Sequence, residues 1–173
     1  MSEKNTAALD PRLQRIAAQV RPGAVFADIG CDHGLLSIQL MRRGAKEGYA
    51  CDINEGPLQA AQKNIAQAGL SDHLHTRLTD GLEGLADCGL TDIIIAGMGG
   101  ENIAAILAAA PWTADGGHTL LLQPQSRPEV LRGFLAGHGY VIQREALVRD
   151  RGHLYPVMEA GAGTMTLSLG QLY

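Results

Sequence analysis

The sequence contains few cysteines, few aromatic residues and no long apolar run. Its three cysteines, Cys31, Cys51 and Cys88, are an odd number without C-x-x-C spacing, which argues against a disulfide framework and against a metal site. No apolar run approaches the length that spans a membrane, and residues 1–5 carry no signal-peptide core. These absences argue against a membrane or secreted protein, and we expect a cytoplasmic protein that holds no metal.

The composition is typical of one folded domain. The chain has 173 residues, of which 46% are hydrophobic and 18% charged, enough apolar surface to bury a core. Neither an internal repeat nor a low-complexity linker divides it, so we expect a single domain over residues 1–173 with an N-terminal helix inside residues 1–23. The net charge of −4 gives no indication that the protein binds nucleic acid, although that property depends on local patches of positive charge and not on the total charge.

Apolar runs and helical patterns alternate along the chain. After a helix that starts at Asp10-Pro11, the pattern predicts strands at 24–29, 49–53, 74–78, 92–96 and 119–122, with helices at 35–43, 57–68, 102–109 and 128–137. The last two apolar runs, 140–148 and 154–158, have no helix between them and predict an antiparallel hairpin, in which Pro156 suits an edge strand. This order predicts an α/β, Rossmann-like class I methyltransferase fold: a doubly wound, mostly parallel seven-stranded sheet that ends in an antiparallel hairpin.

The most informative motif follows the first predicted strand and reads Asp28-Ile-Gly-Cys-Asp-His-Gly34, and the next strand ends in Asp52. A glycine turn and an acid at the next strand tip are typical of a pocket for a ribose nucleotide. The dinucleotide pattern G-x-G-x-x-G is absent, and Asp32 stands where a pyrophosphate would need bare backbone. A carboxylate there repels phosphate but suits an ammonium or sulfonium group. The motif therefore predicts S-adenosylmethionine (SAM) as cofactor and disfavours an NAD-dependent oxidoreductase.

The candidate cofactor-binding residues share positions at the ends of the first four predicted strands: Asp28, Gly30, Asp52, Ile53, Asp80, Gly81, Ala96 and Gly97. We expect Asp52 to accept the ribose hydroxyls, Asp80 to accept the adenine amine and Ile53 to pack on the adenine face. Gly30 would let the methionine end approach the backbone, with Asp28 and Asp32 facing its ammonium group. Each acid taken alone fits a helix cap or a turn equally well.

The fourth predicted strand runs into Gly97-Met98-Gly99-Gly100, and these glycines would leave open space for an acceptor base. A simple tight turn is the alternative interpretation. The Asn/Asp-Pro-Pro-aromatic motif of amino-group methylating enzymes is absent, which disfavours that reaction. The candidate catalytic residues are Asp32, His33 and Gln123, of which His33 also fits a plain turn position. The candidate RNA contacts are Arg12, Arg15, Met98, Gly99 and Arg127.

Four segments resemble the TrmK family of bacterial tRNA adenine-N1-methyltransferases: the motif at 28–34, Asp80-Gly-Leu82, Ile95-Ala-Gly-Met-Gly-Gly100 and Leu122-Gln-Pro124. The resemblance covers about residues 9–158 and implies SAM as methyl donor and N1 of adenine 22 in tRNA as acceptor. Members of that family usually read D-H-A-Y-L-P where this chain has Asp-His-Gly-Leu-Leu-Ser over 32–37, so the aromatic residue is missing. They also usually carry a C-terminal helical extension, which we do not expect within residues 1–173. The alternatives are methylation of a small metabolite and a non-catalytic module that binds SAM or RNA.

Overall fold

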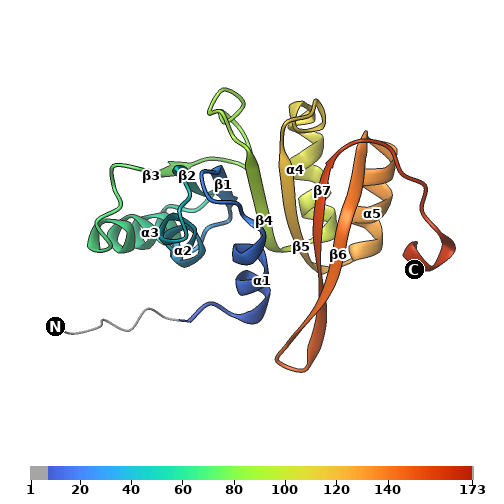
Figure 1. Cartoon of the computed structure of the whole chain (residues 1–173), viewed down its shortest axis with the longest axis horizontal. Coiled ribbons are helices and arrows are strands. Elements are labelled where there is room, and N and C mark those ends of the chain that lie inside the picture. The colour runs from blue at the N-terminus through green and yellow to red at the C-terminus, as the bar shows by residue number, and fades with distance from the viewer. Residues whose placement is uncertain (1–7, 173) are drawn as a thin grey trace.

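A computed structural model describes residues 8–172 and shows one mixed sheet with helices on both faces (Figure 1). The strand order is β3-β2-β1-β4-β5-β7-β6. The strands are β1 (Val25–Ile29), β2 (Glu47–Asp52), β3 (Leu74–Leu78), β4 (Asp92–Gly99), β5 (Thr119–Ser126), β6 (Tyr140–Asp150) and β7 (His153–Ala162). The helices are α1 (Pro11–Gln19), α2 (Leu35–Arg42), α3 (Glu55–Gln67), α4 (Gly100–Ala108) and α5 (Pro128–Gly137), with short 3₁₀ turns at Pro111–Ala114 and Leu169–Gln171.

Strands β1 to β5 are parallel, whereas β7 is antiparallel to both of its neighbours. From β1 the chain proceeds outward to β2 and β3, then crosses back to β4 on the other side of β1. This reversal creates a switch point between β1 and β4, where ligands of open α/β sheets bind beyond the carboxyl ends of the strands. The predicted fold class is confirmed, including the seven-stranded sheet and the antiparallel hairpin.

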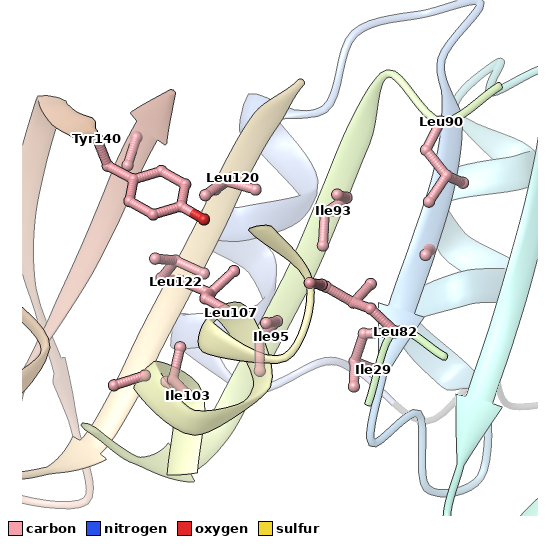
Figure 2. Close-up of a cluster of buried hydrophobic side chains, with 14 of the residues drawn as sticks. Ile29, Leu82, Leu90, Ile93, Ile95, Ile103, Leu107, Leu120, Leu122 and Tyr140 are labelled. Atoms are coloured by element: carbon pink, nitrogen blue, oxygen red, sulfur yellow. The ribbon is translucent and has the colours of Figure 1, made fainter. Parts of the chain in front are cut away.

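Two apolar clusters pack on opposite faces of the sheet because successive strand residues point to opposite sides. In β4, Ile93 and Ile95 contact one cluster and Ile94 contacts the other. Figure 2 shows the first cluster, in which Ile103 and Leu107 of α4 lie over the strands. The helices α1, α2 and α3 cover the second face. Both faces of the central strands are thus buried, which explains their nearly continuous apolar sequence.

Helix α1 begins as the sequence predicts. The Asp10 side chain accepts a hydrogen bond from the Leu13 amide at 2.9 Å, and Pro11 occupies the first turn. Ile16 and Ala17 are buried against the sheet. None of the helices within residues 8–172 is long and apolar enough to cross a membrane.

The hairpin of β6 and β7 differs from the prediction in one respect. Pro156 was expected on an edge strand, but β7 lies between β5 and β6, and β6 is the edge. The proline is tolerated because β7 pairs with β5 only from Met158 to Ala160, so Pro156 lies where the hairpin extends past β5 and pairs with β6 alone. The extension passes beside α1 and contacts it (Figure 1).

Candidate active site

Two clefts open at the carboxyl ends of the parallel strands, and Gly30 lines both of them. The first, here called the α4 cleft, has a volume of about 440 Å³ and is lined by residues that include Ile53, Asp80 and Asn102. The second, here called the α1 cleft, has a volume of about 450 Å³ and is lined on one side by Asp28 and on another by the start of α1. A ligand of nucleoside size can therefore occupy one cleft and reach past Gly30 into the other.

Asp52 holds the backbone of the turns that follow β1 and β2. Its Oδ1 accepts a hydrogen bond from the Asn54 amide at 2.9 Å, and its Oδ2 accepts one from the Asp32 amide at 3.3 Å. The carboxylate is 9% exposed and lines the cleft beside Ile53, whose side chain is 61% exposed although apolar. Asp80 and Gly81 line the same cleft. With Gly30, the α4 cleft thus brings together five of the residues that the sequence assigns to the cofactor.

Gly30 adopts a left-handed backbone conformation with φ 74°. Its amide and that of Cys31 both donate to the Cys51 carbonyl at 2.9 Å, which ties the end of β1 to the end of β2. A Cβ at Gly30 would lie 2.6 Å from the Met98 Cε. The left-handed conformation therefore favours glycine, and any larger residue would also displace the end of the Met98 side chain.

Asp28 is a buried acid on the wall of the α1 cleft. Burial raises its pKa from the ordinary 3.8 to about 6, while a hydrogen bond from the Ser37 hydroxyl to its Oδ2, 2.6 Å long, acts in the opposite direction. The charge of Asp52 adds to the increase. A cation bound in the α1 cleft would favour the ionised form of this carboxyl.

Asp32 and His33 lie in the turn between β1 and α2. The backbone of Asp32 is left-handed, with φ 52°, and its carboxylate lies 3.3 Å from the His33 Nδ1. Both side chains are largely exposed and line the α1 cleft. They are therefore placed to meet a substrate that enters this cleft.

Gln123 lines the α1 cleft, and both its amide oxygen and its amide nitrogen make hydrogen bonds within the protein. Its Oε1 accepts from the Gly97 amide at 3.1 Å and from the Arg12 Nη1 at 3.2 Å, and its Nε2 donates to the Pro124 carbonyl at 3.0 Å. The side chain therefore holds the Gly97 backbone, which has a φ of 78°, against β5. In this structure Gln123 shapes the cleft wall, whereas the sequence placed it at a substrate edge.

The glycine segment 97–100 is not a simple tight turn. Its first three residues complete β4 with irregular pairing to β5, and Gly100 starts α4 against the backbone of Arg127. Ala96 and Gly97 line the α1 cleft, and Met98 lines the α4 cleft. Met98 is thus on the side that was expected to hold the cofactor, while Gly99 lines neither cleft.

The three arginines predicted to contact RNA have different surroundings. Arg12 is 17% exposed and pairs with Asp10 at 2.8 Å and Asp150 at 3.0 Å, so its guanidinium joins α1 to the hairpin rather than standing free for phosphate. Arg15 is exposed in a separate hollow near Arg144. Arg127 pairs with Glu101 and Glu129, which raises its pKa, and lines neither cleft.

Several cleft residues were not found from the sequence. Thr79, Asn102 and Ile106 line the α4 cleft, and Arg151 from the hairpin turn lines the α1 cleft. Asn102 and Ile106 lie four positions apart on α4, a spacing that places them on one face of the helix, but only the packing of α4 shows that this face meets the cleft. Arg151 is brought to the cleft by the docking of the hairpin on α1, for which the sequence carries no signal.

The strand order with its reversed β7, and a divided cleft at the switch point, define the class I methyltransferase fold. The sequence also matches the methyltransferase domain family over residues 9–158. It is 36% identical to the tRNA (adenine(22)-N(1))-methyltransferase of Bacillus subtilis over 160 residues, which are 92% of this chain and 67% of that protein. The chain thus spans about two thirds of the length of this relative.

Two solved structures are closely similar. The crystal structure of the B. subtilis m1A22 tRNA methyltransferase TrmK has a TM-score of 0.88 and 35% identity, covering 95% of this chain and 74% of the other. A Streptococcus pneumoniae protein in complex with SAM has a TM-score of 0.90 and 36% identity, covering 95% of this chain and 78% of the other. The chain belongs to the TrmK family of methyltransferases.

Proposed function

We propose that the protein is a SAM-dependent methyltransferase that methylates N1 of adenine 22 in tRNA. The observation that carries the proposal is the pair of clefts joined at Gly30, one lined by Asp52 and the other by Asp32 and His33. Two clefts that meet at a glycine suit a cofactor that spans both, with the substrate base entering at the mouth of the α1 cleft. Membership of the TrmK family and a SAM-bound structural neighbour support the choice of donor and acceptor.

The residues of the α4 cleft fit the adenosine part of SAM. Asp52 would accept the ribose hydroxyls, because its carboxylate is held in place by two backbone amides. The exposed side chain of Ile53 offers an apolar surface to the adenine ring, and Asp80 would accept from its amine. The methionine part would pass Gly30 into the α1 cleft, where Asp28 and Asp32 would attract its ammonium group. Ala96, Gly97 and Gly81 would complete the walls with small residues.

When bound, SAM supplies a methyl group on a positively charged sulfur, which is already a strong electrophile. Adenine N1 carries a free lone pair, so the protein chiefly has to align the two reactants and exclude water. Asp32 or His33 at the mouth of the α1 cleft would accept a hydrogen bond from the adenine amine and stabilise the charge that develops on the ring. Gln123 would keep the Gly97 wall in position.

A tRNA substrate is favoured over a small metabolite because the 36% identical B. subtilis relative is a tRNA methyltransferase. A non-catalytic module is disfavoured because Asp28, Asp52 and Asp80 are all present at the strand ends and line the clefts. We further propose that residues 1–173 form one domain, since a single sheet joins every strand of the described part. A tRNA substrate is consistent with a cytoplasmic protein.

The proposal is tested by incubating the protein with SAM carrying a labelled methyl group and bulk tRNA that lacks modifications, followed by nucleoside analysis. We expect labelled N1-methyladenosine. Label in small molecules of a cell extract but not in tRNA would support the metabolite alternative. SAM binding without any transfer would support the non-catalytic module.

A further inference from the structure

The turn that joins β6 to β7 holds an arginine where the backbone favours another residue. Asp150 and His153 are paired, and the two residues between them, Arg151 and Gly152, have φ values of 48° and 83°. Two positive φ angles in a two-residue hairpin turn are typical of type I′, whose first position favours asparagine, aspartate or glycine. An arginine in this position is disfavoured by its Cβ, so the local fold gives no reason for it.

The hairpin is anchored so that this arginine reaches the α1 cleft. Arg12 donates from its Nε to Asp150 at 3.0 Å, and its Cζ lies 5.0 Å from the centre of the Tyr155 ring. Both contacts connect α1 to the hairpin within a few residues of the turn. Arg151 consequently lines the α1 cleft together with Asp32, His33 and Gly97, and its side chain is exposed at the rim.

The charges around the α1 cleft leave Arg151 available. Asp10 and Asp150 are both paired with Arg12, and Asp32 lies beside His33. Asp28 is buried and bonded to Ser37. Among the arginines that line this cleft in residues 8–172, Arg12 is engaged by carboxylates and Arg151 has no ion pair. An exposed guanidinium with free donors at the rim of a pocket is suited to an incoming phosphate.

We propose that Arg151 binds a backbone phosphate of the substrate RNA next to the nucleotide that enters the α1 cleft, and that Arg12 is a positioning residue that holds the hairpin. This inference rests on the proposed function, because it takes RNA as the substrate. The phosphate contact that the sequence assigned to Arg12 then belongs to the hairpin turn, and Arg12 acts through Asp150 and Tyr155.

The test uses Arg151→Asn, because asparagine suits the turn and removes the cation without disturbing the backbone. Arg149→Asn is the matched control, since Arg149 is an exposed arginine of the same hairpin that does not line the cleft. For each protein we would measure the dissociation constant of unmodified tRNA at several salt concentrations, the dissociation constant of SAM and the melting temperature. Arg151→Lys shows whether charge alone is sufficient.

We expect Arg151→Asn to weaken tRNA binding roughly tenfold and to lower the slope of log affinity against log salt by about one, with SAM affinity and melting temperature maintained. Arg149→Asn should retain the wild-type tRNA affinity and slope. Equal tRNA affinity and slope in the two variants would overturn the proposal. A weaker SAM affinity in Arg151→Asn would also overturn it, because the guanidinium would then serve the carboxylate of the cofactor. Failure of the wild-type protein to methylate tRNA would instead refute the proposed function.

Discussion

The terminal methyl group of Met98 packs against the backbone of Gly30, so closely that a Cβ on this glycine would lie 2.6 Å from it. The contact lies at the boundary between the two clefts, because Gly30 lines both and Met98 lines the α4 cleft. The two residues come from β4 and from the end of β1, the strands that flank the switch point. Space at the junction of the clefts is thus set by a pair of residues distant in sequence.

Gly30→Ala should lower the free energy of unfolding by about 1–2 kcal/mol through its left-handed backbone, and by a further amount through the contact with Met98. Gly23→Ala is the matched control, because Gly23 has a φ of 81° and nothing within 4 Å of its Cβ position. Urea unfolding measures the free energy of unfolding of both variants. Met98→Ala should lower the free energy of unfolding less in the Gly30→Ala variant than in the wild type, because in the variant it also removes the close contact. If the effects of the two substitutions on the free energy of unfolding were strictly additive, the contact would carry no strain.

Asp52→Asn should raise the SAM dissociation constant at least tenfold, because the proposed contact to the ribose hydroxyls would lose its carboxylate acceptor. Isothermal titration calorimetry measures this constant. Asp87→Asn, which removes an exposed acid outside both clefts, is the control and should bind SAM as the wild type does. An unchanged dissociation constant in Asp52→Asn would remove Asp52 from the cofactor site.

Asp28 should make the free protein less stable as the pH rises from about 4 to about 6. Over that range the unfolded chain releases the Asp28 proton, whose ordinary pKa is 3.8, while the folded chain keeps it until its pKa of about 6. Rising pH therefore favours unfolding, by up to about 3 kcal/mol at 1.36 kcal/mol per pKa unit. Asp28→Asn removes this titration. In urea unfolding, the free energy of unfolding of the variant relative to that of the wild type should therefore be higher at pH 7 than at pH 4. If the free energies of unfolding of the variant and the wild type differed by the same amount at both pH values, the raised pKa of Asp28 would be contradicted.

The same titration should appear in cofactor binding. If Asp28 faces the ammonium group of SAM, SAM affinity of the wild type should fall as the pH drops below about 6, because the neutral carboxyl no longer attracts the cation. Asp28→Asn should bind SAM more weakly at pH 7, with a flatter pH profile. Parallel profiles for the two proteins would place the ammonium group elsewhere.

Asp32→Asn should retain the fold and methylate with a turnover lowered by 10²-fold or so, the size usual for one positioned acid or base, a loss well beyond any loss of SAM affinity. Asparagine is chosen because it tolerates the left-handed backbone of Asp32, whose φ is 52°, better than alanine does. Single-turnover kinetics at saturating SAM separate the chemical step from binding. Undiminished turnover would exclude Asp32 from the reaction.

The sequence predicts the fold well because the information is local. Each of the main signals depends on a few neighbouring residues. They are continuous apolar runs such as 93–95, the helix cap at Asp10 and the acids at the ends of the strands. The position of β7 between β5 and β6, which makes Pro156 part of an interior strand, depends instead on how the hairpin returns to the sheet. No local pattern encodes that return.

The site was predicted less completely for the same reason. Asp52, Ile53 and Asp80 follow strands directly, so their meeting in the α4 cleft follows from strand order. Arg12 was misplaced as a free cation because Asp150, 138 positions away, occupies its Nε. Arg151 was missed because long-range contacts between α1 and the hairpin, to Asp150 and Tyr155 among others, bring the hairpin turn to the cleft. Long-range pairing of charges, unlike strand order, leaves no periodic trace in the sequence.

The most direct test of the central claim is methyl transfer to two tRNA transcripts that differ only at position 22, one with adenine and one with guanine. The account predicts that the first transcript takes up label from SAM as N1-methyladenosine and that the second takes up none. Equal labelling of both transcripts, or no labelling of either by a protein that binds SAM, would contradict it.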